Sequence, residues 1–150
     1  MGSFALLADN RIFHGPADRS GGVLTEAGLS DDKAASHTDA LDMIVDARTM
    51  FLLTTSKISA MSRSSRRTLW NKSIETGSAM ALAGETLFVG SQDKVSAYNA
   101  FNGRLLWSNE VPGQALGLTV ANGALLVSTD TGAIISFGQA TDHPSAWILF

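Results

Sequence analysis

The sequence repeats itself with a period of about 37 residues. Residues 45–74 align without a gap with residues 82–111, and 8 of the 30 positions are identical, where chance would give about two. A third copy follows over residues 120–138, with one extra residue near Gly132, and a fainter first copy covers residues 7–15. The identical pairs of the two best copies are Thr49/Thr86, Phe51/Phe88, Lys57/Lys94, Ser59/Ser96, Ala60/Ala97, Arg67/Arg104, Leu69/Leu106 and Trp70/Trp107. Because similar units must stack on one another, this repeat restricts the chain to solenoids, propellers and related arrays.

Within each copy the residue pattern is that of strands. Short runs rich in β-branched, aromatic and leucine residues alternate with turn residues. The turn pair Asn-Gly, whose residues tolerate positive φ, occurs at Asn102-Gly103 and Asn122-Gly123. The best copy predicts four short antiparallel strands, with approximate bounds 78–83, 85–91, 94–99 and 104–110. Four strands in about 40 residues, repeated along the chain, are what a β-propeller blade requires.

The repeat therefore predicts an all-β fold, a partial β-propeller of about three to four four-stranded antiparallel blades in a single domain. The predicted blades cover about residues 3–41, in a degenerate form, and then 43–75, 78–111 and 115–150. Residues 16–42 are the most polar part of the chain. They predict a long loop in place of the last strand of the first blade, with room for one or two helical turns in Glu26–Ser36.

Composition excludes several classes of function. Eleven Lys and Arg against fourteen Asp and Glu give a formal net charge of −3, so the chain has no general attraction to nucleic acid or to an anionic membrane. The absence of cysteine excludes disulfides, thiolate metal sites and cysteine nucleophiles. No apolar run approaches the roughly 20 residues of a membrane span, and the first residues lack the positive region of a signal peptide. We expect no nucleic-acid partner and no membrane insertion.

A motif near the end of the best copy identifies a family. Residues 97–107 read Ala-Tyr-Asn-Ala-Phe-Asn-Gly-Arg-Leu-Leu-Trp. This segment resembles the tryptophan-docking motif of the PQQ-like, or quinoprotein-type, β-propeller repeats, A-x-D-x-x-T-G-[KR]-x-x-W. Ala97, Gly103, Arg104 and Trp107 match the motif, Asn99 stands for its Asp, and Asn102 stands for its Thr. The copy over residues 60–70 keeps Ala60, Arg67 and Trp70 but lacks the Asp and the Gly, and the last copy carries Trp147 one residue late.

The resemblance implies a structural role for these residues. In such repeats the tryptophan lies between adjacent blades, where an indole buries roughly 150–250 Å². A short residue such as Ala97 lets the indole of a neighbouring repeat pass close to the strand, while an Asx turn and a glycine close the hairpin. We therefore predict a structural docking motif, and no catalytic residue, at Ala60, Trp70, Ala97, Asn99, Gly103 and Trp107.

The same resemblance raises the question of a cofactor. Family members that are alcohol dehydrogenases hold PQQ and Ca²⁺ in the central funnel with acidic and Asn ligands, a catalytic Asp and adjacent cysteines. This chain has no cysteine, and no ligand position transfers to it residue by residue. Asp46, Asp93, Asp130 and Glu85 fall at predicted turns, where acidic residues are common for local backbone reasons. We expect no metal, no PQQ and no enzyme activity; PQQ with calcium belongs to the alternative that the chain is part of a dehydrogenase.

Two other groups of residues could carry chemistry. A basic stripe in the second blade consists of Lys57, Arg63, Arg66, Arg67 and Lys72. No free aromatic residue interleaves with it, so a solvated outer face is favoured over a surface for an anionic partner. Of the three scattered histidines, His14 falls at a strand-interior position and is expected to be half-buried, whereas His37 and His143 are predicted in loops.

The function favoured by the sequence is a non-catalytic PQQ-like propeller module that scaffolds or binds a protein or ligand. The alternative is a portion of a PQQ-dependent quinoprotein dehydrogenase whose active site lies partly outside this chain. Four units amount to half of the seven- or eight-bladed ring that the resemblance implies. The expected partners are therefore the remaining blades of a larger ring or a second copy, besides a possible protein partner. A closed four-bladed ring is the less favoured arrangement, and the resemblance suggests a periplasmic or extracellular location.

Overall fold

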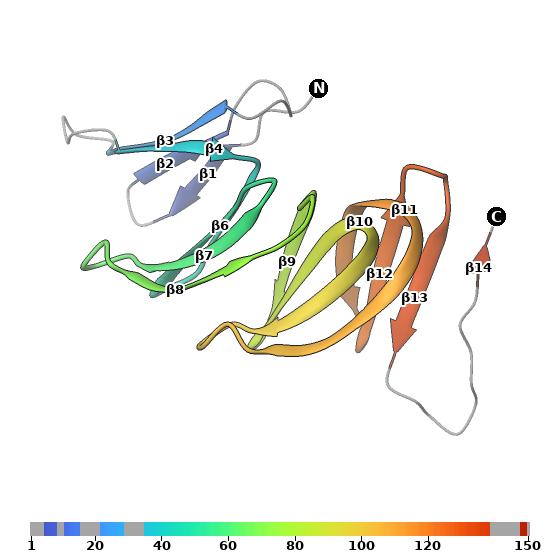
Figure 1. The fold of residues 1–150 in the computed structure, drawn as a ribbon. Helices are drawn as coiled ribbons and strands as arrows, with labels where there is room; N and C mark the ends of the chain where they lie inside the picture. Colours follow the sequence, from blue (N-terminus) through green and yellow to red (C-terminus); the bar gives the residue numbers. More distant parts are fainter. Residues whose placement is uncertain (1–4, 9–10, 16–21, 29–34, 139–147, 150) are drawn as a thin grey trace. The chain divides into compact units, whose positions relative to one another are not determined.

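The computed structural model describes residues 5–8, 11–15, 22–28, 35–138 and 148–149. These residues form fourteen β-strands, and every pairing between them is antiparallel. The prediction of an all-β fold with blade-like sheets is thus confirmed (Figure 1). No helix able to cross a membrane occurs in the part of the chain that the structure describes. The chain divides into two compact units, Met1–Ser73 and Ile74–Phe150.

The first unit contains two four-stranded sheets in simple sequential order. One consists of β1 (Ala5–Ala8), β2 (Arg11–His14), β3 (Gly22–Gly28) and β4 (Ala35–Ala40). The other consists of β5 (Asp42–Val45), β6 (Thr49–Leu53), β7 (Lys57–Ser62) and β8 (Thr68–Ser73). The buried cluster that joins them comprises Phe13, Ala40, Met43, Met50 and Leu52. Both sheets therefore contribute apolar side chains to one core.

The long loop predicted over residues 16–42 is wrong, because β3 and β4 complete the first sheet. Residues 25–28 of β3 pair with β2, and β4 in turn pairs with β3. The helical turns predicted within Glu26–Ser36 are also wrong where the structure describes this segment, since residues 26–28 and 35–36 are strand and 29–34 lie outside the described residues. These strands contain few large apolar residues, and backbone pairing holds β3 on β2 and β4 on β3.

The second unit contains six strands in the order β14-β13-β12-β11-β10-β9. They are β9 (Ala79–Ala83), β10 (Thr86–Asn99), β11 (Leu105–Ala121), β12 (Ala124–Thr129), β13 (Ile134–Gly138) and β14 (Ile148–Leu149). The strands predicted over 85–91 and 94–99 are one continuous strand, β10, and β11 likewise runs past the predicted end at residue 110. Both long strands change partner along their length, as Figure 1 allows the reader to follow.

The change of partner divides the second unit into two blade-like ladders that share β11. Residues 86–90 of β10 pair with β9, and residues 92–98 pair with the first part of β11. The second part of β11, from Ala115, pairs with β12. The core between the ladders consists of Val95, Val111, Ala115, Leu125, Val127, Ala133 and Ile135, with Phe88, Trp107, Leu118 and Phe137 packed against it. This core positions the aromatic residues of the candidate site.

Candidate functional site

The hairpin between β10 and β11 is closed by its own side chains. The Oδ1 atom of Asn99 accepts hydrogen bonds from the backbone N–H groups of Phe101 and Asn102, each at 3.1 Å. The N–H of Gly103 donates to the carbonyl oxygen of Asn99 at 2.8 Å, and Gly103 has a φ of 69°. Only a residue that tolerates positive φ fits that position easily, which explains the glycine. The turn fixes the start of β11 and, with it, the position of Trp107.

The corresponding hairpin of the first unit uses different residues for the same turn. Ser62 takes the place of Asn99, and its Oγ accepts a hydrogen bond from the N–H of Ser65 at 3.3 Å. Arg66, where the other copy has glycine, adopts a φ of 58°. A non-glycine residue in this region is uncommon, and the surrounding strands hold it there. The sequence had lost the motif's Asp and Gly at this hairpin, yet the backbone follows the same course.

Each hairpin sets an alanine directly opposite a tryptophan. Ala60 pairs with Trp70 and Ala97 pairs with Trp107, and both alanines are fully buried. A register shift follows the alanine in both copies. Small residues at these positions leave room for the indoles on the adjacent strand.

The two tryptophans lie against aromatic rings. In the first unit, the ring centroids of Trp70 and Phe51 are 6.1 Å apart. In the second unit, Trp107 lies between Phe88, at 6.1 Å, and Phe137, at 5.7 Å, with tilted ring planes in both pairs. Such distances and tilts are favourable for aromatic pairs. Because Phe88 and Phe137 belong to different ladders, Trp107 bridges the two ladders of its unit.

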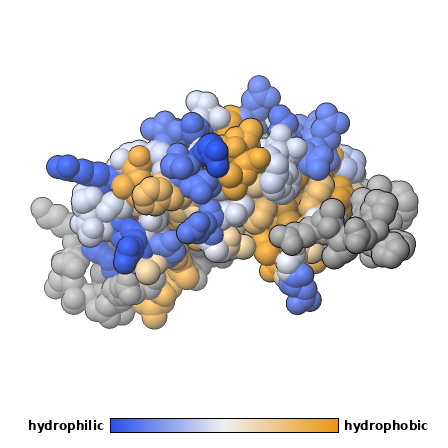
Figure 2. Space-filling model, turned by 90° about the horizontal axis from the view of Figure 1, so that it is seen from below, coloured by the Kyte–Doolittle hydropathy of each residue, from blue (hydrophilic) through white to orange (hydrophobic). Residues whose placement is uncertain are grey.

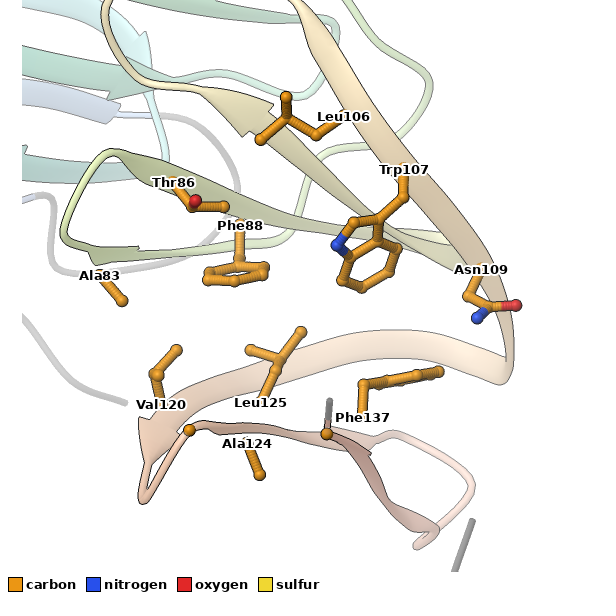
Figure 3. A pocket seen from close by; sticks show the side chains of 12 residues that line it. Ala83, Thr86, Phe88, Leu106, Trp107, Asn109, Val120, Ala124, Leu125 and Phe137 are labelled. Atoms are coloured by element: carbon orange, nitrogen blue, oxygen red, sulfur yellow. The ribbon is translucent and has the colours of Figure 1, made fainter. Parts of the chain in front are cut away.

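A pocket of about 480 Å³ opens beside Trp107. Figure 3 shows the side chains of Phe88 and Trp107 on one side, facing Leu125 and Phe137 on the other. The complete lining is Ala83, Thr86, Phe88, Leu106, Trp107, Asn109, Val120, Gly123, Ala124, Leu125, Phe137 and Gly138. Thr86 and Asn109 are its only polar side chains, so the pocket suits an apolar or aromatic group better than a charged one.

Apolar residues continue from the pocket onto the surface. Leu106, which lines the pocket, is 43% exposed, and its neighbour Leu105 is 52% exposed. Phe101, at the tip of the hairpin, is 86% exposed. On the face drawn in Figure 2, apolar surface, in orange, lies among polar residues. Within the described residues, the stretch 105–110 of β11 pairs with β10 alone, so one backbone edge of the pocket wall has no ladder partner there.

The acidic residues singled out in the sequence hold turns together. Asp46 Oδ1 accepts hydrogen bonds from the N–H groups of Arg48 and Thr49, both at 2.7 Å. Asp93 Oδ1 accepts from Gly113 N at 3.0 Å, and Asp130 Oδ1 accepts from Gln114 N at 2.8 Å. Glu85 contributes its backbone carbonyl, which accepts from Ala100 N at 2.8 Å. Among the described residues, no three His, Cys, Asp or Glu side chains lie together as metal ligands would.

The basic stripe is mostly solvated. Lys57, Arg66, Arg67 and Lys72 are exposed. Arg63 is half-buried, because its Nη1 donates to the carbonyl oxygen of Asp46 at 2.7 Å. One member of the stripe therefore braces a turn.

Two expectations about the histidines are wrong. His14 is exposed at the end of β2, although Leu52 at the equivalent position of the next sheet is buried. His37 lies half-buried within β4 and not in a loop. His143 and Trp147 lie outside the described residues. Among the described residues, the face of the first sheet that carries His14 is thus more exposed than the equivalent face of the next sheet.

Sequence reasoning did not predict the pocket. One wall of the pocket is formed by Phe137. This residue follows the extra residue near Gly132, so the repeat alignment does not match Phe137 to an aromatic wall residue of the other copies. The identical pairs Phe51/Phe88 and Trp70/Trp107 were the available signal, because in each copy they mark an aromatic pair in contact.

Comparison by family shows that residues 54–148 match the family described as outer membrane protein assembly factor BamB. Comparison with curated proteins by sequence gives no significant match.

Solved structures resemble the chain in fold. The computationally designed Ika4 protein superposes with a TM-score of 0.76 at 11% identity, over 91% of this chain and 89% of that one. BamB from Moraxella catarrhalis gives 0.70 at 18% identity, over 88% of this chain and 41% of that one. A europium-containing methanol dehydrogenase gives 0.59 at 16% identity, over 71% of this chain and 23% of that one. The chain thus spans less than half the length of these two natural proteins.

Proposed function

This chain belongs to the family of the outer membrane protein assembly factor BamB, and from that premise we propose that it is a non-catalytic propeller module that binds another protein. The occupant we propose for the Trp107 pocket is an extended segment of the partner. It would place one apolar side chain between the wall formed by Phe88 and Trp107 and the wall formed by Leu125 and Phe137. The family name further supports a periplasmic or outer-membrane-associated place of action.

The observation that carries this proposal is the combination of an apolar pocket with a strand edge. Leu106 and Trp107 line the pocket, and both belong to the stretch of β11 whose outer edge has no ladder partner among the described residues. A segment added along that edge would gain backbone hydrogen bonds, while the pocket would select its apolar side chain. Backbone pairing would supply affinity and the pocket would supply specificity.

The dehydrogenase alternative receives less support from the residues present. The likeness to the methanol dehydrogenase concerns the fold, at 16% identity. PQQ and calcium need several anionic or amide oxygens directed at one point. The carboxylates of Asp93 and Asp130 accept the backbone N–H groups of the adjacent residues Gly113 and Gln114, and among the described residues no third acidic or histidine side chain joins them. This arrangement of the carboxylates supports the non-catalytic proposal over the dehydrogenase.

Two neighbouring leucines offer a matched test. We would measure, by fluorescence polarisation, the binding of labelled eight-residue peptides that alternate Leu or Phe with polar residues, beside an all-polar peptide. Leu106→Ser removes a pocket side chain and should weaken binding at least tenfold. Leu105→Ser, which removes a similarly exposed leucine outside the pocket lining, should change it less than threefold. Equal loss in both variants, or equal binding of the all-polar peptide, would overturn the proposal.

A second titration tests the alternative that the chain is part of a PQQ-dependent dehydrogenase. PQQ with Ca²⁺ would be added to the chain while tryptophan fluorescence is recorded. We expect no saturable quenching. Saturable quenching at one PQQ per chain would contradict the non-catalytic proposal and favour the dehydrogenase.

A further inference from the structure

Sheet-to-sheet packing uses the same repeat positions in both units. Side chains alternate between the two faces of a strand, so consecutive residues point in opposite directions. Each sheet has two faces. We call the face that carries Phe13 in the first sheet, or Phe88 in its counterpart, the leading face. The opposite face, which carries the residues just before and after that phenylalanine, is the trailing face. In the first unit, Phe13 packs in one core with Met50 and Leu52 of the next sheet. In the second, Phe88 packs with Leu125 and Val127, each 75 positions later than its counterpart.

The trailing face of the first sheet is uncovered. Ile12 and His14 occupy the repeat positions of Met50 and Leu52. Ile12 is 37% exposed and His14 is exposed, whereas Met50 is 1% exposed and Leu52 is 8% exposed. Apolar side chains at these positions become buried when the leading face of another sheet packs on them. Among the residues that the structure describes, no sheet buries Ile12 and His14 in this way.

We call the last sheet the ladder of β12, β13 and β14 with the second part of β11. Its leading face is uncovered among the described residues. Leu126 occupies the repeat position of Phe13 and Phe88 and is 38% exposed, against 1% for Phe13. Ile134 occupies the position of Val95 and is 49% exposed, against 0% for Val95. Ser128 on β12 pairs directly with Ile134 and is itself exposed. The last sheet thus presents an apolar leading face with a polar residue at its centre.

We propose that these two faces dock onto each other between two copies of this chain. The leading face of the last sheet in one copy, with Leu126 and Ile134, would pack on the trailing face of the first sheet in the other copy, with Ile12 and His14. The repeat supplies the reason, because equivalent faces already pack on each other within both units. The arrangement proposed is a closed pair, because a pair that closes uses both faces of each chain and leaves no open face to recruit a third copy.

The length of the chain relative to the BamB structure is consistent with a second copy as the partner. The match covers 88% of this chain and 41% of the BamB structure, so two copies together are close to that protein in size. His14 and Ser128 replace the apolar or small residues of the internal contacts, so this contact is weaker than those within a unit. A reversible dimer is therefore expected. The proposal does not depend on the Trp107 pocket, which lies between two ladders of one unit.

The test is the solution mass of the whole chain, measured by light scattering over a hundredfold concentration range. A mass rising to about twice 15.8 kDa, and no further, is expected. Leu126→Asp, Ile134→Asp and Ile12→Asp should each weaken dimerisation at least tenfold while the circular dichroism spectrum stays unchanged. Leu69→Asp is the matched control, since Leu69 is 55% exposed on β8, outside both faces, and this variant should dimerise normally.

Charge reversal across the contact tests the proposed partners. A chain that carries both Ile12→Lys and Ile134→Asp should dimerise more strongly than either single variant, because opposite charges then face each other. A mass of one chain at every concentration would overturn the proposal. So would growth beyond two chains, or a dimer that Leu69→Asp disrupts and Ile134→Asp does not.

Discussion

At the scale of the residue, Trp107 both stabilises its unit and forms part of the pocket, and substitution can measure the first of these roles. Its indole bridges two ladders through Phe88 and Phe137, and it lines the pocket. Trp107→Ala should lower the free energy of unfolding by about 3 kcal/mol, because a large aromatic contact is lost from a packed core. Trp107→Phe, which keeps a ring between the same neighbours, should cost less than half as much. Urea unfolding followed by circular dichroism measures both, and equal losses would show that the ring contacts do not stabilise the unit.

The residue scale is also where the sequence was most informative. The spacing of Asn99 and Gly103 predicted the turn, because positive φ leaves a strong mark on residue choice. The sequence placed Ala97 against the indole of a neighbouring repeat, and its pairing with Trp107 of the same hairpin was not predicted. His14 also escaped prediction. Its position in the repeat is a strand interior, and its exposure depends on whether another sheet covers that face, which no local pattern encodes.

At the scale of the element, the close approach of β10 and β11 depends on a glycine. A Cβ atom at Gly90 would lie 2.6 Å from the carbonyl oxygen and 2.9 Å from the Cβ of Ala115. The same carbonyl accepts a hydrogen bond from Ser78 Oγ at 2.5 Å, which fixes its place. Gly90→Ala should therefore force the strands apart and destabilise the chain by about 2 kcal/mol.

The control for this prediction is another strand glycine. A Cβ atom at Gly138 meets nothing within 4 Å, so Gly138→Ala should leave the free energy of unfolding within about 0.5 kcal/mol of the original chain. Comparing the urea midpoints of the two variants isolates the steric effect from the general effect of replacing glycine. Similar midpoints would mean that β11 can retreat from β10 without loss.

The elements that sequence reasoning missed are those whose formation depends on pairing with other strands more than on their own residue pattern. β3 and β4 are held by their ladders, and their polar composition resembles that of a loop. The joining of predicted strands into β10 and β11 likewise depends on how the backbone continues through Asp93 and Ala115, and register shifts near both residues mark the points where partners change. Periodicity predicts which residues face a core, whereas continuity and pairing are decided by tertiary contacts.

At the scale of the whole molecule, an array of like sheets is stable to the extent that its end faces are covered. If a second copy covers them, the chain's stability must depend on its own concentration, because association removes folded chains from the unfolding equilibrium. Each tenfold increase in protein concentration should then raise the apparent free energy of unfolding by up to about 0.7 kcal/mol per chain, because the free folded chain varies as the square root of the total concentration. We therefore expect the urea midpoint to rise steadily between micromolar and hundred-micromolar protein.

The variants show whether the rise of the urea midpoint with protein concentration comes from the proposed contact between two copies or from nonspecific association. Ile134→Asp disables the leading face of the last sheet, so its midpoint should be lower and nearly independent of concentration. Leu69→Asp should keep the dependence of the original chain. A midpoint that does not move with concentration in the original chain would mean that the exposed apolar faces contribute nothing to its stability, and that Ile12, Leu126 and Ile134 are tolerated at the surface of a folded single chain.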